Sequence, residues 1–329
     1  MSKFSALQAR ESAAGGFEQV IVQRDIDDLP AGELLIRVKY SSLNYKDALS
    51  ASGNRGVTKS FPHTPGIDAA GVVEASSVAE FSAGDEVIVT GYDLGMNTSG
   101  GLAQYIRIPA SWALKRPKGL SLREAMVLGT AGLTAALCVD KLEQSGLTPD
   151  AGTVLVTGAT GGVGSVAVAL LTTLGYRVAA STGKAEQTDY LKALGAQQIV
   201  LRAELQDGTD KPMLKEQWAG AVDCVGGDIL FNVVKSLRYG ASVACCGLTA
   251  GVGFKGSVLP FILRGVNLLG VDSVELPLVV KASMWDKLSL QWKVKLDALV
   301  TEVTLEQLPD AIAQILAGKQ VGRVLVNLG

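Results

Sequence analysis

A glycine-rich turn between an apolar strand and an apolar helix is the segment of this sequence best suited to chemistry. Residues 154–157 are apolar or β-branched, residues 165–171 are mostly apolar, and the turn between them has the spacing Ala159-x-Gly161-x-x-Gly164. Small residues let the backbone approach phosphate groups, and a helix N-terminus offers free N–H donors. This strand–turn–helix context is the one that a dinucleotide-binding turn requires, although alanine replaces the usual first glycine. The expected contacts to the pyrophosphate are Thr160, Gly161, Gly162 and Val163.

The end of the next expected strand, residues 176–181, indicates which dinucleotide binds. A site for NAD usually has Asp or Glu about 20 residues after the glycines, where it binds the ribose 2′-OH. Here Ser181 is followed by Thr182, Gly183 and Lys184, with no carboxylate. Hydroxyl groups and a cation suit a 2′-phosphate, which a carboxylate would repel. We therefore expect NADPH as the cofactor, with a solvated loop position as the alternative role of Lys184.

Composition limits the class of protein. The chain has 329 residues, enough for two domains, and 48% of them are hydrophobic. A net charge of −2 gives no electrostatic support to nucleic-acid binding. The four cysteines show no pairing or ligand spacing, the N-terminus lacks a signal-peptide core, and no apolar run approaches membrane-spanning length. We expect a cytoplasmic protein without a membrane or nucleic-acid partner.

The elements that position the glycine turn change in type along the chain. Residues 33–40, 68–74 and 85–90 alternate like strands of an antiparallel, barrel-like module. Helical faces follow over residues 122–128 and 133–142, with Ser121 and Glu124 as a capping box. From residue 154 strands and helices alternate, which predicts a doubly wound parallel sheet. The tail ends in a strand over residues 323–327 that returns to the first module.

Several longer segments resemble one branch of the medium-chain dehydrogenase/reductase superfamily. They include Asn44-Tyr45-Lys46-Asp47, Phe61-Pro-His-Thr-Pro-Gly-Ile-Asp68, residues 128–136, the glycine turn and Pro260-Phe-Ile-Leu-Arg264. Together they are similar to the zinc-free quinone-oxidoreductase-like group and, within it, to the acrylyl-CoA reductase family. The match spans essentially the whole chain. It implies an α/β fold with a GroES-like antiparallel β-barrel catalytic domain, residues 1–122 and 298–329, and a doubly wound Rossmann domain, residues 123–297.

The resemblance also implies an activity and further cofactor contacts. The activity is NADPH-dependent reduction of acryloyl-CoA to propionyl-CoA. The loop that contains Tyr45 is expected over the nicotinamide, and Leu248 is expected near its ribose, at the carboxyl end of the sheet. Ile262, Ser273 and Arg323 are implied near the cofactor. Arg323 suits a bidentate phosphate contact, with a surface position on an edge strand as the alternative.

No metal is expected. Zinc alcohol dehydrogenases of the superfamily have a catalytic Cys where this chain has Asn44, and a His-Glu pair where it has Ile67 and Asp68. Residues 92–101 contain none of the four cysteines of their structural zinc site. His63, the single histidine, lies between prolines and is expected to be a surface or packing residue.

Without a metal, conjugate reduction of an activated alkene is the simplest chemistry. Hydride attack at the β-carbon places charge on the thioester oxygen, which then needs hydrogen-bond donors. The expected donors are the Asn44 amide and the Tyr45 hydroxyl, and the alternative is that both residues only brace a turn. Asp47 is expected to cap a helix without a chemical role.

Substrate and subunit partners are the last expectations. An acyl-CoA substrate carries phosphates, for which Lys46, Arg55, Lys59 and Arg264 are available. The apolar residues 266–274 predict an edge strand and a two-fold dimer contact. Two other functions stay open: a quinone or enone reductase acting on small free molecules, and a catalytically idle NADPH-binding redox sensor or structural protein.

Overall fold

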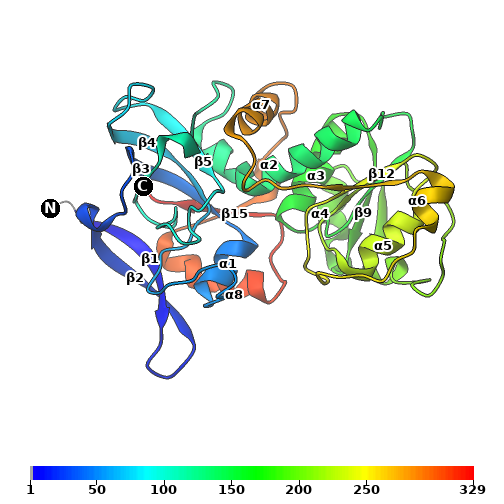
Figure 1. The fold of residues 1–329 in the computed structure, drawn as a ribbon, viewed down its shortest axis with the longest axis horizontal. Helices are drawn as coiled ribbons and strands as arrows, with labels where there is room; N and C mark the ends of the chain where they lie inside the picture. The colour runs from blue at the N-terminus through cyan, green and yellow to red at the C-terminus, as the bar shows by residue number, and fades with distance from the viewer. Residues whose placement is uncertain (1–2) are drawn as a thin grey trace. The chain divides into compact units, whose positions relative to one another are not determined.

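The computed structural model describes residues 3–329, which divide into two units (Figure 1). The first unit contains the described residues up to Thr130 together with Val274–Ser289 and Leu299–Gly329. The second contains Ala131–Ser273 and Leu290–Ala298. The expected division grouped residues 123–297, whereas here Val274–Ser289 belongs to the first unit.

The first unit is built on antiparallel sheets, as expected. A hairpin of β1 (Lys3–Glu11) and β2 (Phe17–Asp25) stands beside a seven-stranded sheet in the order β14-β15-β3-β4-β5-β7, with β6 paired to β3. The strands of that sheet are β3 (Leu34–Leu43), β4 (Asp68–Ser76), β5 (Glu86–Thr90), β6 (Tyr105–Ile108), β7 (Ala113–Lys115), β14 (Val300–Val303) and β15 (Arg323–Asn327). Its helices are α1 (Tyr45–Ala51), α7 (Leu278–Ser289) and α8 (Leu308–Leu316). In the first half of β3, Leu34, Ile36 and Val38 are buried and alternate with more exposed residues, so this period-two pattern reflects one face on the core.

The chain returns to this sheet at its C-terminal end, as the sequence predicted. β15 pairs antiparallel with β3, with Val324 opposite Leu43, and parallel with β14. β15 is therefore an interior strand of the sheet, and its residues 323–326 are buried.

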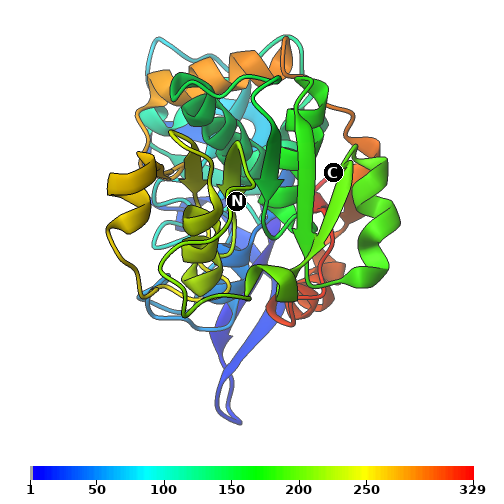
Figure 2. The same ribbon diagram turned by 90° about the vertical axis from the view of Figure 1, so that its right-hand side faces the viewer.

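The second unit is a doubly wound parallel sheet, which confirms the predicted Rossmann architecture (Figure 2). Its order is β10-β9-β8-β11-β12-β13, so the chain moves to one side of β8 and then to the other. The strands are β8 (Thr153–Val156), β9 (Arg177–Thr182), β10 (Gln198–Leu201), β11 (Gly220–Asp223), β12 (Ser242–Cys245) and β13 (Asn267–Gly270). The helices are α3 (Gly162–Thr173), α4 (Thr188–Ala193), α5 (Gly227–Ser236) and α6 (Leu259–Arg264). Ligands of such sheets bind at the carboxyl ends of the strands where the order reverses, here β8 and β11.

Helix α2 (Leu122–Gln144) contains the two helical segments that the sequence predicted, joined at a break. Gly129 lies at the break with φ of 51°. The predicted capping box is confirmed, since Ser121 N donates to Glu124 Oε2 at 2.7 Å and Glu124 N to Ser121 Oγ at 3.1 Å. The expectation that no apolar run approaches membrane-spanning length is wrong. By length and composition, α2 is long and apolar enough to cross a membrane. It is mostly buried within the protein, however, as is the core helix of a globular fold.

Six single turns of 3-10 helix complete the described elements: η1 (Ile26–Asp28), η2 (Ala110–Trp112), η3 (Ala185–Gln187), η4 (Arg202–Leu205), η5 (Asp297–Leu299) and η6 (Leu305–Gln307).

Candidate functional site

The glycine turn forms the cradle that the sequence predicted. Gly161 is the N-cap of α3, so Gly162, Val163 and Gly164 contribute first-turn N–H groups that have no partner within the helix. A side chain at Gly164 would overlap the carbonyl of Gly158 and the Cα of Ala159. The missing Cβ therefore lets α3 start directly against the turn, and the N–H groups remain open to a phosphate.

The end of β9 lies beside this turn. Ala159 N donates to the carbonyl of Ser181 at 3.0 Å, and the hydroxyl oxygens of Thr160 and Thr182 are 3.4 Å apart. The hydroxyl of Thr182 also accepts from Lys184 N at 2.9 Å, which holds the chain in a tight turn through Gly183. The structure thus brings together all the residues expected to bind the pyrophosphate and the 2′-phosphate.

A second cation, Arg202, lies over Gly183, and our sequence analysis missed it. A Cβ built on Gly183 would be 2.8 Å from Arg202 Cζ. The cause is the sheet register: β10 pairs with β9, Leu201 is opposite Thr182, and Arg202 directly follows Leu201. A basic residue immediately after the strand next to β9 was the available signal.

Charge and burial at this turn favour an anion. The pKa of Lys184 is lowered first by burial and also by the charge of Arg202, while Glu186 opposes the shift. A phosphate that binds between these two cations would stabilise the charged form of Lys184. The site therefore fits a 2′-phosphate better than a bare ribose.

The remaining expected contacts of the second unit are spread over several loops. Leu248 and Ile262 are exposed, at 56% and 69%. Ser273 is buried and accepts a hydrogen bond from Thr134 Oγ1 at 2.7 Å. Their part in nucleotide binding stays a prediction.

In the first unit, Asn44 is the centre of a buried polar network. Its side-chain Nδ2 donates to Asp68 Oδ2 at 2.8 Å, and its Oδ1 accepts from Arg323 Nη1 at 3.3 Å. The second hydrogen of Nδ2 faces the Ser42 carbonyl and Asp47 Oδ2, each at 3.3 Å. The amide is therefore fully engaged within the protein. We call the following residues the Asn44 network: Ser42, Asn44, Asp47, Asp68, Thr130 and Arg323.

Asp68 is saturated with donors. Its Oδ2 accepts from Ser42 Oγ at 2.5 Å and from Thr130 N at 2.9 Å, and its Oδ1 accepts from Thr130 Oγ1 at 2.5 Å. Thr130 N is available because α2 breaks at Gly129, where a Cβ would overlap Ser42 Oγ and Asp68 Oδ2. The helix break and the carboxylate thus depend on each other.

Asp47 caps α1, as expected. Its Oδ2 accepts from Asn44 N at 2.7 Å and its Oδ1 from Ile67 N at 2.8 Å. Burial raises its pKa to about 7, the charge of Asp68 adds to the rise, and the two backbone donors oppose it. Asp47 therefore titrates near neutral pH.

Arg323 is buried, at 3% exposed, on the interior strand β15, so the alternative of a surface arginine on an edge strand is wrong. Its Nε donates to the carbonyl of Val127 at 3.0 Å, just before the α2 break. Its Nη2 has no hydrogen-bond partner among the described residues. Burial lowers the pKa of Arg323, and the charges of Asp68 and Asp47 oppose the shift. The guanidinium is the positive member of the Asn44 network.

Tyr45 begins α1 directly after Asn44 and is 43% exposed, so a ligand can reach its ring. The basic residues considered for a CoA substrate differ in their surroundings. Arg264 donates to the carbonyls of Lys235 and Leu214 at 2.7 Å each, so it stabilises the second unit instead of presenting a free charge. Arg55 pairs with Glu11 at 2.8 Å on the surface.

The donor set does not fit a metal. Among residues 3–329, no three His, Cys, Asp or Glu side chains are grouped to hold an ion. At the positions of the superfamily's catalytic ligands, Asn44 and Asp68 bond to each other, and Ile67 has no donor atom.

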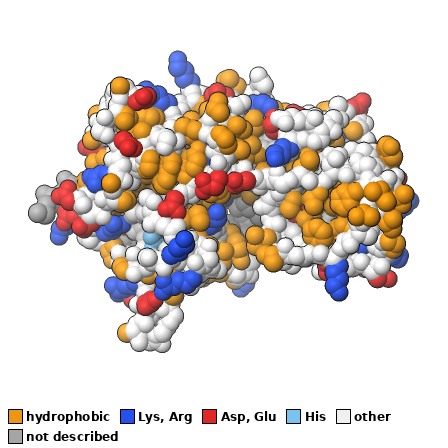
Figure 3. Space-filling view, viewed as in Figure 1, with side chains coloured by type: hydrophobic (Ala, Val, Ile, Leu, Met, Phe, Trp, Pro, Cys, Tyr) orange, Lys and Arg blue, Asp and Glu red, His pale blue; other side chains and the backbone are white. Residues whose placement is uncertain are grey.

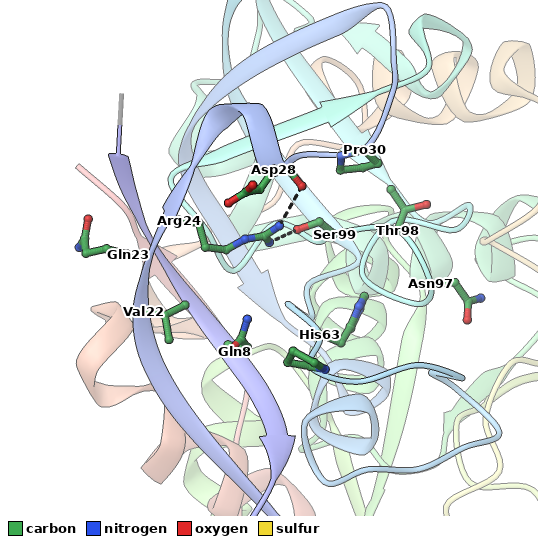
Figure 4. Close-up of a pocket in the computed structure, with 11 residues that line it drawn as sticks. Gln8, Val22, Gln23, Arg24, Asp28, Pro30, His63, Asn97, Thr98 and Ser99 are labelled. Carbon is green, nitrogen blue, oxygen red and sulfur yellow. Dashed lines mark hydrogen bonds between the residues drawn. The ribbon is translucent and has the colours of Figure 1, made fainter. Parts of the chain in front are cut away.

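A cavity of the first unit, about 680 Å³, is lined by none of the expected site residues (Figure 4). Arg24 crosses it and donates to Ser99 Oγ at 2.7 Å. His63 Nε2 is 3.0 Å from the Gly95 carbonyl, and burial lowers the pKa of this histidine. Its backbone also pairs with Ala9. His63 is thus a packing residue, one of the two roles expected for it.

Comparison with known proteins gives consistent matches over the whole chain. The family described as "Alcohol dehydrogenase GroES-like domain" matches residues 30–118, and "Zinc-binding dehydrogenase" matches residues 162–289. Acrylyl-CoA reductase AcuI of Ruegeria pomeroyi is 46% identical over 327 residues, 99% of each chain. YhfP of Bacillus subtilis, named as a quinone oxidoreductase, is 48% identical over 99% of each chain.

Solved structures agree. The crystal structure of YhfP with NAD bound has a TM-score of 0.96 and covers 100% of both chains. That of the YhdH oxidoreductase of Salmonella enterica in complex with NADP also has a TM-score of 0.96, with 43% identity, and covers 99% of this chain and 100% of that one.

Proposed function

This chain belongs to the acrylyl-CoA reductase and YhfP/YhdH family of medium-chain oxidoreductases, and we propose that it reduces the alkene of acryloyl-CoA to propionyl-CoA with NADPH. The observation that carries the proposal is the 46% identity to AcuI over 99% of both chains. The coarser statement, that the protein is an oxidoreductase of this family, does not depend on the substrate.

The cofactor choice has its own support. Lys184, Arg202 and the Thr182 hydroxyl surround Gly183, and none of them is a carboxylate. The YhdH structure holds NADP, whereas the YhfP structure holds NAD. We infer that the two cations make this chain prefer NADPH.

When bound, NADPH supplies a hydride for the β-carbon of the substrate, and charge then develops on the thioester oxygen. A donor must point at that oxygen. In our proposal Tyr45, whose ring is exposed at the start of α1, takes this part and would also contact the nicotinamide.

Asn44 takes a different part from the one expected. Its amide is engaged by Asp68 and Arg323, so it lacks an N–H group for the substrate. We assign Asn44 to positioning: it fixes the entry into α1, and therefore the place of Tyr45.

Reduction of small quinones or enones is the second candidate, supported by the 48% identity to a protein named as a quinone oxidoreductase. A catalytically idle NADPH-binding protein, used as a redox sensor or structural protein, is the third. One panel separates the three: turnover of acryloyl-CoA, crotonyl-CoA and 1,4-benzoquinone with NADPH.

We expect the highest kcat/KM with acryloyl-CoA. With NADPH labelled by deuterium at C4, deuterium should appear at the methyl carbon of propionyl-CoA and a solvent proton at the α-carbon. Turnover of benzoquinone but not of acryloyl-CoA would identify the protein as a quinone reductase. No turnover of any compound, with tight NADPH binding, would select the idle protein.

We also propose a cytoplasmic homodimer that pairs at β13. This strand is at the edge of the second unit's sheet, and exposed apolar side chains lie around the neighbouring α6, among them Leu263 and Val258 (Figure 3). An unpaired strand edge with apolar surroundings favours a two-fold contact. Sedimentation of the wild type should give twice the chain mass, and Leu269→Lys should give the monomer.

A further inference from the structure

Three of the four cysteines meet in the second unit, although they are far apart in the sequence. Cys224 directly follows β11, and Cys246 directly follows β12. Their sulfur atoms are 3.9 Å apart. The thiol of Cys138, from α2, interacts with Cys246 as well. The sequence spacing gave no sign of this proximity, and the cysteines are free thiols in the structure.

The sheet register explains the approach. β11 and β12 are parallel neighbours with Asp223 opposite Cys245, and Cys246 N donates to the Asp223 carbonyl at 3.0 Å. Cys224 and Cys246 are thus opposite each other one residue further on, with side chains on the same face. Cys245, one position earlier, points to the other face.

This spacing is compatible with a covalent bond. Neighbouring strands are about 4.8 Å apart, and a disulfide spans Cα atoms about 4.4–6.8 Å apart. Rotation of the side chains is then the movement that would bring the two sulfurs from 3.9 Å into bonding distance. As whole residues, Cys224 and Cys246 are partly exposed.

The backbone of the pair is held firmly. Thr157 Oγ1 accepts from Cys224 N at 3.0 Å and donates to Asp223 Oδ1 at 2.7 Å. Asp223 Oδ2 accepts from Gly226 N at 2.7 Å. The two thiols are therefore preorganised by the turn that follows β11.

The thiols differ in acidity. Hydrogen bonds from Cys138 and Cys224 lower the pKa of Cys246, against the effect of burial. Cys246 raises the pKa of Cys224 in turn, with burial adding to the rise. Cys246 is the better nucleophile, and Cys224 is the thiol that remains protonated beside it.

We propose that Cys224 and Cys246 form a reversible disulfide when the protein meets a hydroperoxide. The Cys246 thiolate attacks the peroxide, an S–O bond forms, the O–O bond breaks, and the departing oxygen takes a proton to become water or an alcohol. The sulfur of Cys224 then attacks the resulting sulfenic acid, an S–S bond forms, and hydroxide leaves with the Cys224 proton as water. Two electrons pass from the thiols to the peroxide, and a dithiol reductant then returns the disulfide to two thiols while it is itself oxidised to a disulfide.

The proposed disulfide has a consequence for nucleotide binding. Only this consequence, and not the disulfide itself, rests on the proposed cofactor site. Gly247 packs so closely on Cys224 that a Cβ on it would overlap the Cys224 backbone. Leu248, the proposed contact to the nicotinamide ribose, follows Gly247. Bound NADP⁺ and the disulfide are therefore expected to oppose each other.

The test treats the reduced full chain with hydrogen peroxide, blocks remaining thiols with N-ethylmaleimide and maps the peptides by mass spectrometry. We expect the loss of two alkylatable thiols and a peptide that links Cys224 to Cys246, reversed by dithiothreitol. Cys224→Ser and Cys246→Ser should abolish the link, and Cys245→Ser, the neighbouring control, should keep it.

Three results would overturn the proposal. They are a link between Cys138 and Cys246, oxidation that stops at sulfenic acid, and oxidation of Cys246 that is no faster than oxidation of Cys245. The wild-type peptide map decides this even if a variant does not fold. Preincubation with NADP⁺ should slow the link severalfold. An equal rate would overturn the connection to the cofactor and leave the disulfide standing, so this inference and the proposed function fail separately.

Discussion

Arg323 and Asn44 are 279 positions apart, yet Arg323 Nη1 donates to Asn44 Oδ1 at 3.3 Å inside the first unit. The contact joins the last strand of the chain to the residue that precedes α1. Arg323 also holds the Val127 carbonyl at the α2 break. One side chain therefore fixes three segments around the proposed position of Tyr45.

Replacing Arg323 by Met should destabilise the protein strongly. The variant leaves Asp68 and Asp47 without their buried counter-charge, which costs about 3–5 kcal/mol. Urea unfolding followed by circular dichroism measures the loss. Arg37→Met is the matched control, because Arg37 is half-exposed and only 3.8 Å from the equally exposed Glu74, a surface pair that contributes about 0–1 kcal/mol. Equal losses in the two variants would contradict the role of Arg323.

Asp47 should make stability fall as pH rises. Its pKa is raised to about 7 in the folded protein, above the ordinary value of 3.8, so the unfolded chain releases this proton first. The contribution of Asp47 is complete below the ordinary pKa and is lost as pH rises towards 7, at no more than about 1.4 kcal/mol per pH unit. Unfolding free energies of the wild type and Asp47→Asn between pH 4.5 and 7.5, roughly the range of the shift, test this. The wild type minus variant difference should decline with pH, and a constant difference would count against the buried titration.

Lys184→Ala and Arg202→Ala should each weaken NADPH selectively. Loss of a hydrogen bond to a charged group costs about 1.5–3 kcal/mol, which is roughly a 10- to 150-fold rise in KM. The KM for NADH should stay nearly unchanged, since NADH lacks the 2′-phosphate. The exposed Lys192→Ala, on α4, serves as the control. A parallel loss with both nucleotides would move the phosphate site elsewhere.

Activity should survive exhaustive chelation. The positions of the superfamily's zinc ligands hold Asn44 and Asp68, which bond to each other at 2.8 Å, and Ile67. Dialysis against a strong chelator followed by the NADPH assay should leave kcat unchanged. Elemental analysis that finds one firmly held zinc per chain would disprove the expectation.

Local patterns predicted much of this structure. The alternation of residues 33–40 predicted β3, and the capping box of Ser121 and Glu124 predicted the start of α2. Both patterns depend only on residues that are near one another in the sequence. The glycine turn could be predicted for the same reason. The doubly wound order followed from alternating strands and helices, which restrict the topology.

Side-chain contacts that depend on the pairing of strands distant in the sequence could not be predicted. Arg202 reaches Gly183 only through the β9–β10 register, and Cys224 meets Cys246 only through the β11–β12 register. The burial of Arg323 depends on the insertion of β15 between β14 and β3. Asn44 looked like a free donor because two of its partners, Asp68 and Arg323, are remote in the sequence.

The Asn44 network has an evolutionary consequence, which is epistasis. Each member forms a hydrogen bond with another. A single replacement at Asn44, Asp68 or Arg323 therefore leaves buried polar groups of its partners without a hydrogen bond, whereas a joint replacement removes those polar groups as well. Such neighbours deviate from additivity by about 0.5–3 kcal/mol. A lineage that exchanges this arrangement for a metal-binding one must therefore cross a fitness valley, or change these three positions nearly together.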